Sequence, residues 1–350
     1  MSHPVSILSL ATHTPPHELS QDTAVEVARA LLAETFRDFE RMTPVFTNAG
    51  IQHRQLACPV DWYRDERSFA ERTAVYLDVG LELFITAATR ALADAGIAAD
   101  AVDTIVTVSS TGIATPSLEA RALGRMGFRT DVSRVPVFGL GCAGGVSGLG
   151  LAAKLARATP GSVVLFVTVE LCSLAFQTGN IGKSDIIAAA LFGDGAAACV
   201  IRTGDEGFVQ ISSSGEKIWP DTLDIMGWEI QPGGLGVVLN RAIPAFARQN
   251  MRAAIEEMLA PQSLTIAQVD RFICHPGGAK VVDAIEQALS LNQGSLDHER
   301  EVLRAHGNMS APTALFVLDE VRQQGLPPLS VLTALGPGFT ASSVTLRKAA

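Results

Sequence analysis

One stretch of the sequence decides the fold: Val135-Pro-Val-Phe-Gly-Leu-Gly-Cys-Ala-Gly-Gly-Val-Ser-Gly-Leu-Gly150. Its first residues, through Phe138, predict the end of a buried strand, its glycines allow a sharp turn, and a helical pattern continues to Arg157. We expect Cys142 at the strand-to-helix corner, where unpaired N–H groups and the helix dipole favour negative charge. Such a helix start can lower a cysteine pKa from about 8.5 to roughly 3.5–7.5, which would make Cys142 a nucleophile.

Two other interpretations of this corner stay open here. Free cysteine is among the most often buried residue types, so Cys142 also fits a place in the core. The run Gly139-Leu-Gly-Cys-Ala-Gly144 matches the G-x-G-x-x-G pattern of dinucleotide sites. Such sites need an acidic residue about 20 positions later, and Glu170 stands further along the chain. The dinucleotide interpretation is therefore weak, and a nicotinamide dehydrogenase is a distant alternative.

The composition indicates a large α/β protein. The chain has 350 residues, of which 47% are hydrophobic, and a formal net charge of −9. It has no run of five or more basic residues, so no nucleic-acid partner is expected. Its five cysteines, an odd number without C-x-x-C spacing, argue against a disulfide framework or a zinc site. Without a signal-peptide pattern or an apolar run of about 20 residues, we expect a reduced, cytoplasmic protein without stable membrane insertion.

The predicted elements alternate between strands and helices along the chain. Strands are predicted at residues 5–12, 102–108, 163–169, 192–201, 269–274 and 330–334, and helices at residues 24–36, 77–95, 116–127, 146–157, 244–259 and 313–323. Loops and short helices are expected over residues 37–73. This alternation predicts a mostly buried α/β sheet.

The second half of the chain repeats the first at one offset. Val269 begins a strand that resembles the strand at Val102, 167 residues earlier. The same offset carries the corner of Cys142 onto the segment that contains Asn308, which also precedes a predicted helix. We infer duplicated βαβ halves, an N-terminal half over 1–206 and a C-terminal half over 207–350. Two copies packed about a pseudo-twofold axis would bring equivalent corners together.

Three reactive side chains are expected to meet in this arrangement. His275 follows a strand, at the carboxyl end where open α/β sheets place their sites. A cysteine nucleophile needs a histidine that takes its proton and a polar group that orients the reactants. Cys142, His275 and Asn308 supply these types, although His275 also fits a structural role and Asn308 a turn or helix cap. The remaining histidines show no paired ligand spacing, so no metal site is predicted.

Three further features of the sequence have interpretations that bear on the loops. Glu170 ends a strand and fits either a buried acid that orders loops or a direct role in chemistry. Asp194 stands between two glycines and is interpreted as a turn residue. The segment Gly336-Pro-Gly338 predicts a rigid turn, either a plain hairpin or one wall of a pocket.

Five ordered motifs resemble those of the type III polyketide synthases, the chalcone synthase-like branch of the thiolase fold. The motifs are Gly141-Cys-Ala-Gly-Gly145, Leu191-Phe-Gly-Asp-Gly-Ala196, His275-Pro-Gly-Gly278, Gly307-Asn-Met-Ser310 and Gly336-Pro-Gly338. The resemblance runs over nearly the whole chain and implies a five-layered α-β-α-β-α fold. It implies Cys142 as the acyl-carrying nucleophile, with His275 and Asn308 as catalytic partners. It also implies acyl-CoA and malonyl-CoA as substrates, a homodimer, and no metal or organic cofactor.

The resemblance also implies residues that bind substrate and CoA. Phe192 corresponds to the aromatic gate between the CoA tunnel and the cavity. The other implied substrate-binding residues are Cys172, Ala175, Val237, Trp228, Thr111, Ser310, Gly336, Pro337 and Gly338. The implied CoA-binding residues are Arg41, Arg54 and Gly277, where Arg54 compensates for a family lysine that residues 43–46 lack.

The sequence departs from the plant members of this family in ways that bear on the substrate. Cys172 and Ala175 stand for two cavity threonines, and Val237 stands for a second gate phenylalanine. Thr115 stands for a methionine that reaches across the dimer. These changes argue against a phenylpropanoid starter. The stretch Leu223-Asp-Ile-Met-Gly-Trp228 looks like bacterial members that extend fatty acyl starters, so we expect a medium- or long-chain acyl-CoA and alkylpyrone or alkylresorcinol products.

Two related classes remain as alternatives. A β-ketoacyl-carrier-protein synthase III shares the fold and the triad and carries out a single condensation. That class is expected to show His-Gln-Ala-Asn where this chain has His275-Pro-Gly-Gly278. A non-catalytic acyl-binding member would have lost a triad residue, and all three are present here.

Overall fold

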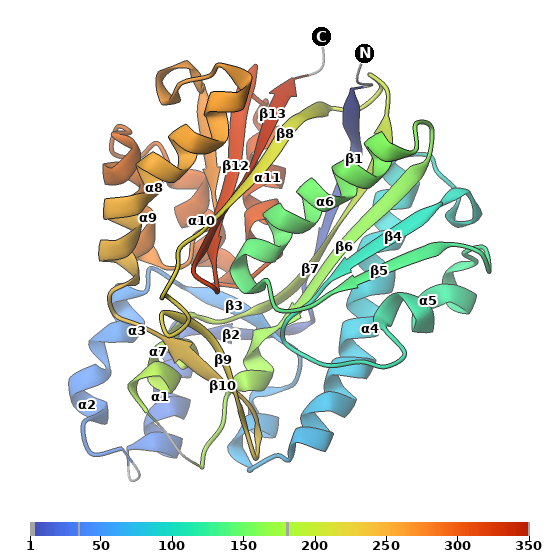
Figure 1. The fold of residues 1–350 in the computed structure, drawn as a ribbon. Coiled ribbons are helices and arrows are strands. Elements are labelled where there is room, and N and C mark those ends of the chain that lie inside the picture. Colours follow the sequence, from blue (N-terminus) through green and yellow to red (C-terminus); the bar gives the residue numbers. More distant parts are fainter. Residues whose placement is uncertain (1–3, 34–35, 180–181, 349–350) are drawn as a thin grey trace.

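A nine-stranded sheet runs through the whole molecule in the computed structural model, which describes residues 4–33, 36–179 and 182–348 (Figure 1). The strand order is β11-β12-β13-β8-β1-β7-β6-β4-β5. These strands are β1 (Val5–His13), β4 (Thr104–Val108), β5 (Ser133–Val137), β6 (Val163–Leu171), β7 (Asp194–Thr203), β8 (Val209–Ile218), β11 (Arg271–Cys274), β12 (Leu329–Gly336) and β13 (Thr340–Lys348). Two further sheets have two strands each: β2 (His17–Ser20) pairs with β3 (His53–Leu56), and β9 (Met226–Gln231) pairs with β10 (Gly234–Leu239).

The two halves of the large sheet have the same strand order and the same strand directions. The neighbours are β4, β6, β7 and β1 in the first half, and β11, β12, β13 and β8 in the second. In each half the first pair is parallel and the next two pairs are antiparallel. This symmetry confirms the predicted duplication. The halves join where residues 5–7 of β1 pair with β8, a connection that the sequence did not indicate.

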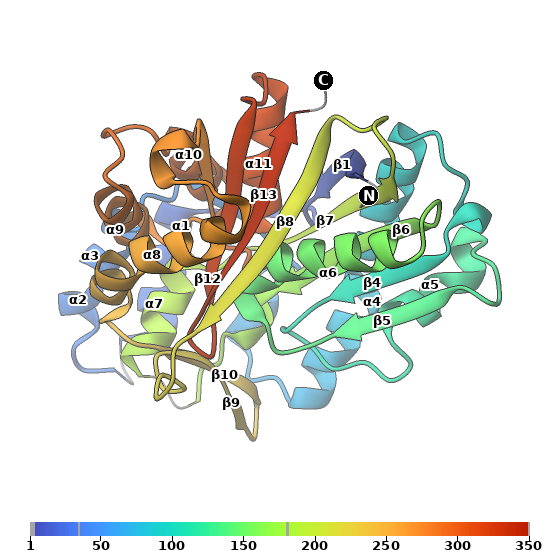
Figure 2. The ribbon, with the colours of Figure 1, turned by 45° about the horizontal axis from the view of Figure 1, so that its top comes forward.

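Five layers of secondary structure result from this topology. The helices α6 (Gly144–Ala158) and α11 (Thr313–Gln323) form the middle layer, and each contacts strands of both halves. Figures 1 and 2 show α6 running between the two parts of the sheet. The outer faces are covered by α4 (Phe69–Asp94) and α5 (Leu118–Met126) on the first half, and by α8 (Ile243–Leu259) and α9 (Ala279–Leu289) on the second.

The composition of the central elements explains this layering. β6 is buried along its whole length, because α4 packs against one of its faces and α6 against the other. Its apolar, mostly β-branched residues are typical of a strand that is covered on both sides. α6 consists largely of glycine, alanine and leucine, and its small side chains let it pack closely between the two halves of the sheet.

Short helices connect these layers and surround the ends of the strands. The remaining α-helices are α1 (Gln21–Leu32), α2 (Phe39–Met42), α3 (Pro44–Asn48), α7 (Lys183–Leu191) and α10 (Asp297–His306). The 3-10 helices are η1 (Val60–Arg64), η2 (Ala99–Ala101), η3 (Gly141–Ala143), η4 (Cys172–Ala175), η5 (Ala260–Gln262) and η6 (Ile266–Gln268). Among the described residues, none of the helices is both long enough and apolar enough to span a membrane.

Local capping explains where two predicted helix boundaries were wrong. α4 begins at Phe69 rather than at residue 77, because Ser68 and Glu71 form a reciprocal capping box at its N-terminus. α1 begins at Gln21 rather than at residue 24, because the Ser20 hydroxyl accepts the Thr23 N–H. The predicted end of this helix includes residues 34–35, which lie outside the described residues.

The strand before Cys142 is an edge strand. β5 pairs with β4, and within the described part of the chain its other side has no paired strand. Its residues are exposed or half-buried, and Phe138, directly after it, is 56% exposed. The prediction of a buried strand at this place is therefore wrong. The turn into a helix that was predicted to follow is present as η3 and α6.

Candidate active site

A cavity of about 310 Å³ brings together the three reactive side chains. Cys142, His275 and Asn308 all line it, and each is at most 8% exposed. Cys142 comes from the first half of the fold and the other two from the second half. The pseudo-twofold arrangement of the two halves therefore places the three groups around one space.

Close backbone packing positions Cys142 against the second half. Cys142 lies in η3, immediately before α6. A Cβ atom on Gly145 would lie 2.1 Å from the carbonyl oxygen of Ala311, so only glycine lets this turn approach the segment that carries Asn308. Gly141 has a φ of +48°, and a Cβ there would meet the ring of Pro337 at 2.7 Å.

The loop that leads to Cys142 is fixed by a buried carboxylate. Both oxygens of Glu170 accept the N–H of Ser110, at 3.1 and 3.0 Å. The hydroxyl of Ser110 in turn accepts the N–H groups of Gly139 and Gly141, at 3.2 and 3.0 Å. Glu170 thus orders the loop, which is one of the two roles that the sequence left open for it.

His275 faces the cavity with an unpaired ring. His275 directly follows β11, and its backbone N–H donates to the backbone carbonyl of Thr333 on β12 at 2.8 Å. This bond continues the parallel pairing of the two strands and fixes the backbone of His275. Among the described residues, neither buried ring nitrogen of His275 has a hydrogen-bond partner, so both can serve a substrate or Cys142.

Two hydrogen bonds fix the orientation of the Asn308 side-chain amide. Its Oδ1 accepts the Ser310 N–H at 2.8 Å, and its Nδ2 donates to the carbonyl of Gly277 at 3.2 Å. An amide nitrogen carries two N–H groups, and the second one faces the cavity, where it hydrogen-bonds Cys142. Gly277 also donates its own N–H to the carbonyl of His275 at 3.1 Å, so one short loop orients both catalytic candidates.

Burial keeps Cys142 and His275 neutral in this state of the site. Burial raises the pKa of the Cys142 thiol to about 11, although hydrogen bonds with Ser310 and Asn308 oppose this rise. Burial lowers the pKa of His275 to about 4. The predicted thiolate with a low pKa is therefore not what this structure shows. The sequence indicated the helix start correctly, but the energetic penalty of charging a dehydrated thiol outweighs the dipole of the helix.

Phe192 and the hairpin of β9 and β10 form one wall of the cavity. Phe192 follows α7 and lines the cavity, and its ring centroid lies 6.1 Å from that of Trp228 on β9. Trp228 pairs with Val237 of β10, and both line the same cavity, as do Cys172, Ser310 and Pro337. These positions are where substrate-binding residues were expected.

Four other residues that were expected to bind substrate do not line this cavity. The Thr111 hydroxyl donates to Glu170 at 2.7 Å, which engages it in the loop network. Ala175 lies behind the cavity, in η4. Gly336 packs against Ala143, where a Cβ would lie 2.6 Å from the Ala143 methyl group. Gly338 lies in the turn between β12 and β13, so this segment is both a hairpin turn and, through Pro337, a cavity wall.

Asp194 is a buried anchor and not the turn residue that the sequence predicted. It is fully buried at the start of β7. Its carboxylate accepts the N–H of Ala57 at 2.6 Å, and the N–H of Ser173 at 2.8 Å together with the Ser173 hydroxyl. Asp194 therefore ties β3 to η4, the segment that carries Cys172.

The cations at the mouth of the cavity differ from those expected to bind CoA. Arg41 is exposed on α2 and does not line the cavity. Arg54 is only 1% exposed and lies behind Phe192, too deeply buried to meet a phosphate at the mouth. Instead, Arg241 and Lys280 line the cavity and have exposed side chains. Gly277, the third residue expected to bind CoA, also lines the cavity.

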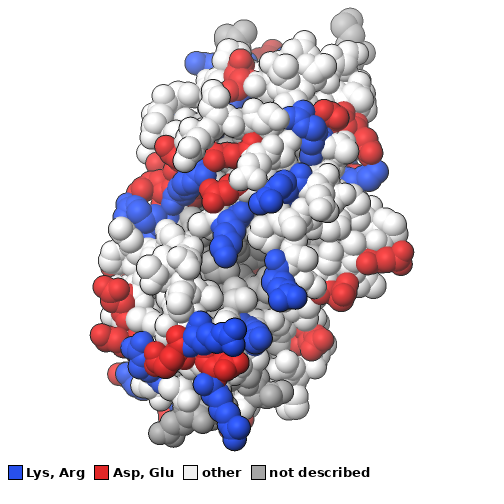
Figure 3. All heavy atoms as spheres, turned by 90° about the vertical axis from the view of Figure 1, so that its left-hand side faces the viewer, with Lys and Arg blue, Asp and Glu red and all other residues white. Residues whose placement is uncertain are grey.

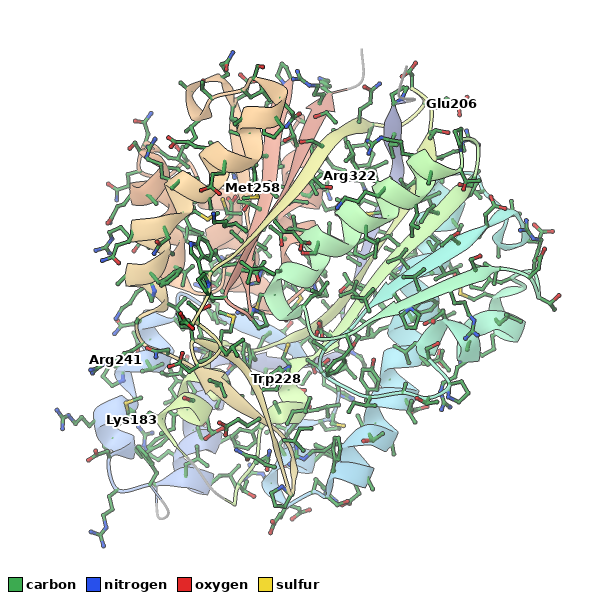
Figure 4. The ribbon with its side chains drawn as sticks, viewed as in Figure 1. Lys183, Glu206, Trp228, Arg241, Met258 and Arg322 are labelled. Atoms are coloured by element: carbon green, nitrogen blue, oxygen red, sulfur yellow. The ribbon has the colours of Figure 1, made fainter. Side chains whose placement is uncertain are left out.

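Two views locate the positive charge at the cavity mouth. Figure 3 shows Lys and Arg side chains gathered round a hollow on the face that lies at the left of Figure 1. In Figure 4, Arg241 lies at the left-hand edge, on the loop that precedes α8, and Trp228 lies further inside. The sequence contains one feature from which Lys280 could have been predicted as a residue of the site: it follows the glycines of the His275 motif at the start of a helix. Arg241 has no comparable local signal.

The fold and the cavity define a class of protein: enzymes that carry acyl groups on a cysteine. A thiol, an imidazole and a carboxamide around one buried space can accept an acyl group and stabilise an enolate, and cations at the mouth suit a substrate with phosphates. Two family models match the chain: chalcone and stilbene synthases, N-terminal domain, at residues 59–205, and C-terminal domain, at residues 210–350. The chain therefore belongs to the chalcone and stilbene synthase family, the type III polyketide synthases.

Individual proteins agree with this assignment. A 1,3,6,8-tetrahydroxynaphthalene synthase of Streptomyces peucetius subsp. caesius is 39% identical, covering 98% of this chain and 93% of that protein. A putative chalcone synthase of Bacillus subtilis is 34% identical, covering 95% and 96%. The crystal structure of the 1,3,6,8-tetrahydroxynaphthalene synthase of Streptomyces coelicolor, a bacterial type III polyketide synthase, matches with a TM-score of 0.93 at 26% identity, covering 99% of each chain. Type III polyketide synthases condense acyl groups with malonyl-CoA with loss of CO2, so the chain is an acyltransferase.

Proposed function

We propose that the chain loads a medium- or long-chain fatty acyl group from acyl-CoA onto Cys142, extends it with malonyl-CoA and cyclises it to an alkylpyrone or alkylresorcinol. The observation that carries the proposal is the one cavity lined by Cys142, His275 and Asn308. The aliphatic starter is supported by the apolar residues that share this cavity: Val45, Ile187, Leu191, Val237, Val238, Leu239 and Leu335. A pyrone product is supported by a relative named alpha-pyrone synthesis polyketide synthase-like Pks18 of Mycobacterium tuberculosis, 29% identical over 95% of this chain.

Loading begins with a proton transfer between the two neutral groups. The Cys142 thiol gives its proton to a ring nitrogen of His275 as the sulfur attacks the thioester carbonyl of acyl-CoA. The bond between that carbonyl carbon and the CoA sulfur then breaks, and the departing CoA thiolate takes the proton from the imidazolium. Because both groups are neutral before attack, the buried site is not required to hold separated charges while it is empty.

Extension uses the donors on the opposite half of the fold. Loss of CO2 from malonyl-CoA leaves an electron pair on the α-carbon, which is delocalised as an enolate onto the thioester oxygen. The Asn308 N–H that points to Cys142 in the empty site and an N–H of His275 stabilise this oxygen, and one such donor is typically worth about 3 kcal/mol. The α-carbon attacks the acyl carbon on Cys142, the bond from that carbon to the Cys142 sulfur breaks, and the lengthened chain is left as a thioester of CoA. The Cys142 thiolate then attacks this thioester and releases CoA thiolate, which reloads the chain for the next extension. These protein groups supply the chemistry in the proposal, so it needs no metal or organic cofactor.

CoA recognition is assigned to the mouth of the cavity. Arg241 and Lys280 are exposed cations at this place, on a chain whose formal net charge is −9. Among the described residues, no carboxylate forms an ion pair with either of them, so both are available to CoA phosphates. Phe192 and Trp228 lie deeper and keep water from the thioester, which favours loss of CO2 from the charged malonyl group.

A cytoplasmic homodimer is part of the proposal. All five cysteines are buried thiols without a disulfide, which suits a reducing compartment. The edge strand β5 and the exposed Phe138 offer a surface that a second copy of the chain can cover. Light scattering at several protein concentrations tests this part: a dimer mass supports it, and a monomer mass contradicts it.

The 39% identity to a 1,3,6,8-tetrahydroxynaphthalene synthase favours a second candidate, in which the product is a polyhydroxylated naphthalene. One experiment decides between the candidates. The protein is incubated with malonyl-CoA and a series of acyl-CoAs from acetyl to palmitoyl, or with malonyl-CoA alone, and products are identified by mass spectrometry. Alkylpyrones or alkylresorcinols support the first candidate, and tetrahydroxynaphthalene supports the second. A single β-keto product, or no covalent loading of Cys142, would contradict both.

A further inference from the structure

A second cavity, of about 80 Å³, lies behind the catalytic one. The two cavities share two lining residues, Cys172 and Phe192. Cys172 and Phe192 therefore form the partition between the two cavities, and an acyl chain held on Cys142 would enter the second cavity by displacing these two side chains. Nothing in the mechanism above uses this space.

Most of the wall of the second cavity is apolar, and five of its lining residues are alanines. Ala24 and Ala28 of α1 face Ala188 and Ala189 of α7 across it, and Leu56 and Val60 close it further. Alanine leaves room where a larger residue would fill the gap between two packed helices. The shape and chemistry of this part suit a short length of alkyl chain.

One side of the same cavity is polar and incompletely paired. Arg54 lines it, is 1% exposed, and donates from Nη1 to the carbonyl of Phe192 at 3.4 Å. Its Nε and Nη2 are buried without a partner among the described residues. A buried charged group whose N–H donors have no acceptor lowers the stability of the fold. This side of the cavity therefore suits an oxygen atom of a ligand better than a hydrocarbon group.

The surroundings of Arg54 keep its charge but do not satisfy its donors. Burial lowers the pKa of Arg54 to about 10, and the nearby Asp194 opposes the fall, so the guanidinium is still charged at neutral pH. The Asp194 carboxylate is already occupied by Ala57 and Ser173. The Ser173 hydroxyl is also paired with the hydroxyl of Tyr63, at 2.6 Å.

We propose that the second cavity binds the distal part of the growing chain, with its alkyl tail between α1 and α7 and a keto oxygen against the guanidinium of Arg54. The inference rests on the proposed function, because a chain with an alkyl tail followed by keto groups is what extension of a fatty acyl starter produces. Arg54 is then a substrate-binding residue that stabilises the extended chain. Its role differs from the contact with CoA phosphates that the sequence suggested.

A non-reactive β-diketone tests this site without turnover. Binding of nonane-2,4-dione to the full chain is measured by isothermal titration calorimetry for the wild type and for Arg54→Met, Arg54→Lys, Ala28→Leu and Ala30→Leu. Arg54→Met removes the donors and Ala28→Leu fills the alkyl part of the cavity, so each should weaken binding about tenfold. Arg54→Lys keeps a charge and should restore part of the loss. Ala30→Leu adds the same volume on the exposed side of α1 and should leave the affinity unchanged.

Every outcome of this titration decides the proposal. Equal affinities in all variants, or no binding to the wild type, would overturn it. Weakening by Arg54→Met alone would overturn the placement of the alkyl tail, and weakening by Ala28→Leu alone would overturn the role of Arg54. Thermal unfolding followed by circular dichroism shows whether each variant is folded, and Ala28→Leu tests the site even if Arg54→Met is not. If the dione binds as expected but Cys142 is loaded by no acyl-CoA, the proposed function fails while the site stands.

Discussion

Phe192 and Asn308 are joined by an isolated parallel bridge between their backbones. The N–H of Asn308 donates to the carbonyl of Leu191 at 2.8 Å, and the N–H of Gly193 donates to the carbonyl of Asn308 at 3.0 Å. A movement of α7 that shifts the Phe192 ring therefore also shifts the amide of Asn308. The position of the Phe192 ring and the position of Asn308, the donor proposed to stabilise the enolate, are thus linked through the backbone.

Replacement of Cys142 by alanine should abolish acyl loading. The thiol is the nucleophile in the proposed mechanism, and loss of a nucleophile typically lowers turnover by about 1,000-fold or more. Intact-protein mass spectrometry after incubation with octanoyl-CoA measures the acyl adduct. Cys199→Ala is the matched control, because Cys199 is a fully buried thiol outside the cavity. An acyl adduct of normal yield in Cys142→Ala would show that another group carries the chain.

Replacement of Asn308 by aspartate should separate loading from extension. Aspartate keeps an oxygen for the Ser310 N–H but has no N–H for the enolate, so condensation should fall about 100- to 1,000-fold while Cys142 is still loaded. Release of CO2 from labelled malonyl-CoA and the acyl adduct on Cys142 are measured on the same samples. Asn250→Asp, on the outer helix α8, is the control. Unchanged CO2 release in Asn308→Asp would contradict the assigned role of the amide.

The alkylation of Cys142 should accelerate with pH across the accessible range. Because burial raises the pKa of this thiol to about 11, the thiolate fraction is small at neutral pH and increases as the pH rises toward that value. Below the pKa, the rate constant for iodoacetamide should increase about tenfold per pH unit. Peptide mass spectrometry gives the rate for Cys142, with Cys199 as a buried reference. A rate constant that is already constant below neutral pH would mean that Cys142 and His275 form an ion pair in the free enzyme.

Charge reversal at the cavity mouth should weaken binding of CoA substrates. Arg241→Glu places a negative charge where CoA phosphates are expected, so KM for acyl-CoA should rise about tenfold with kcat nearly unchanged. The KM for the matching acyl-pantetheine, which has no phosphates, should stay the same. Lys154→Glu, on an exposed part of α6 outside the cavity, is the matched control. An equal rise in KM for both substrates would rule out phosphate recognition by Arg241.

The site could be predicted from the sequence where local pattern and symmetry determine it. The glycines around Cys142 indicated a turn, and the offset that relates the strands at Val102 and Val269 indicated which corners correspond. Both signals are local or periodic, and tertiary packing preserves them. The predicted strands and helices were accordingly found near their expected places, including the strand that ends next to His275.

The features that the sequence did not reveal depend on tertiary environment. Asp194 resembles a turn residue because of its two glycines, but it is buried where three donors meet it. Arg54 resembles a surface cation, but β3 carries it beneath Phe192. The Cys142 thiol stands at a helix start, but burial controls its pKa. In each case the decisive quantity is dehydration by residues distant in sequence, which no local pattern encodes.

The contact between Gly145 and Ala311 holds the two halves of the active site together, and this can be tested on stability. A methyl group on Gly145 would lie 2.1 Å from the Ala311 carbonyl oxygen, so Gly145→Ala must push α6 away from the segment of Asn308. Such overpacking should lower the free energy of unfolding by about 2–3 kcal/mol. Gly124→Ala, in α5, has no atom within 4 Å of the added methyl group. It should instead stabilise the protein by about 0.5–1 kcal/mol, since alanine is the better helix former. Urea unfolding midpoints of the two variants give both values. Gly145→Ala also moves Cys142 relative to Asn308, so the rate of condensation should fall more than the rate of acyl loading. If the variant unfolds and condenses like the wild type, α6 does not set the distance between Cys142 and Asn308.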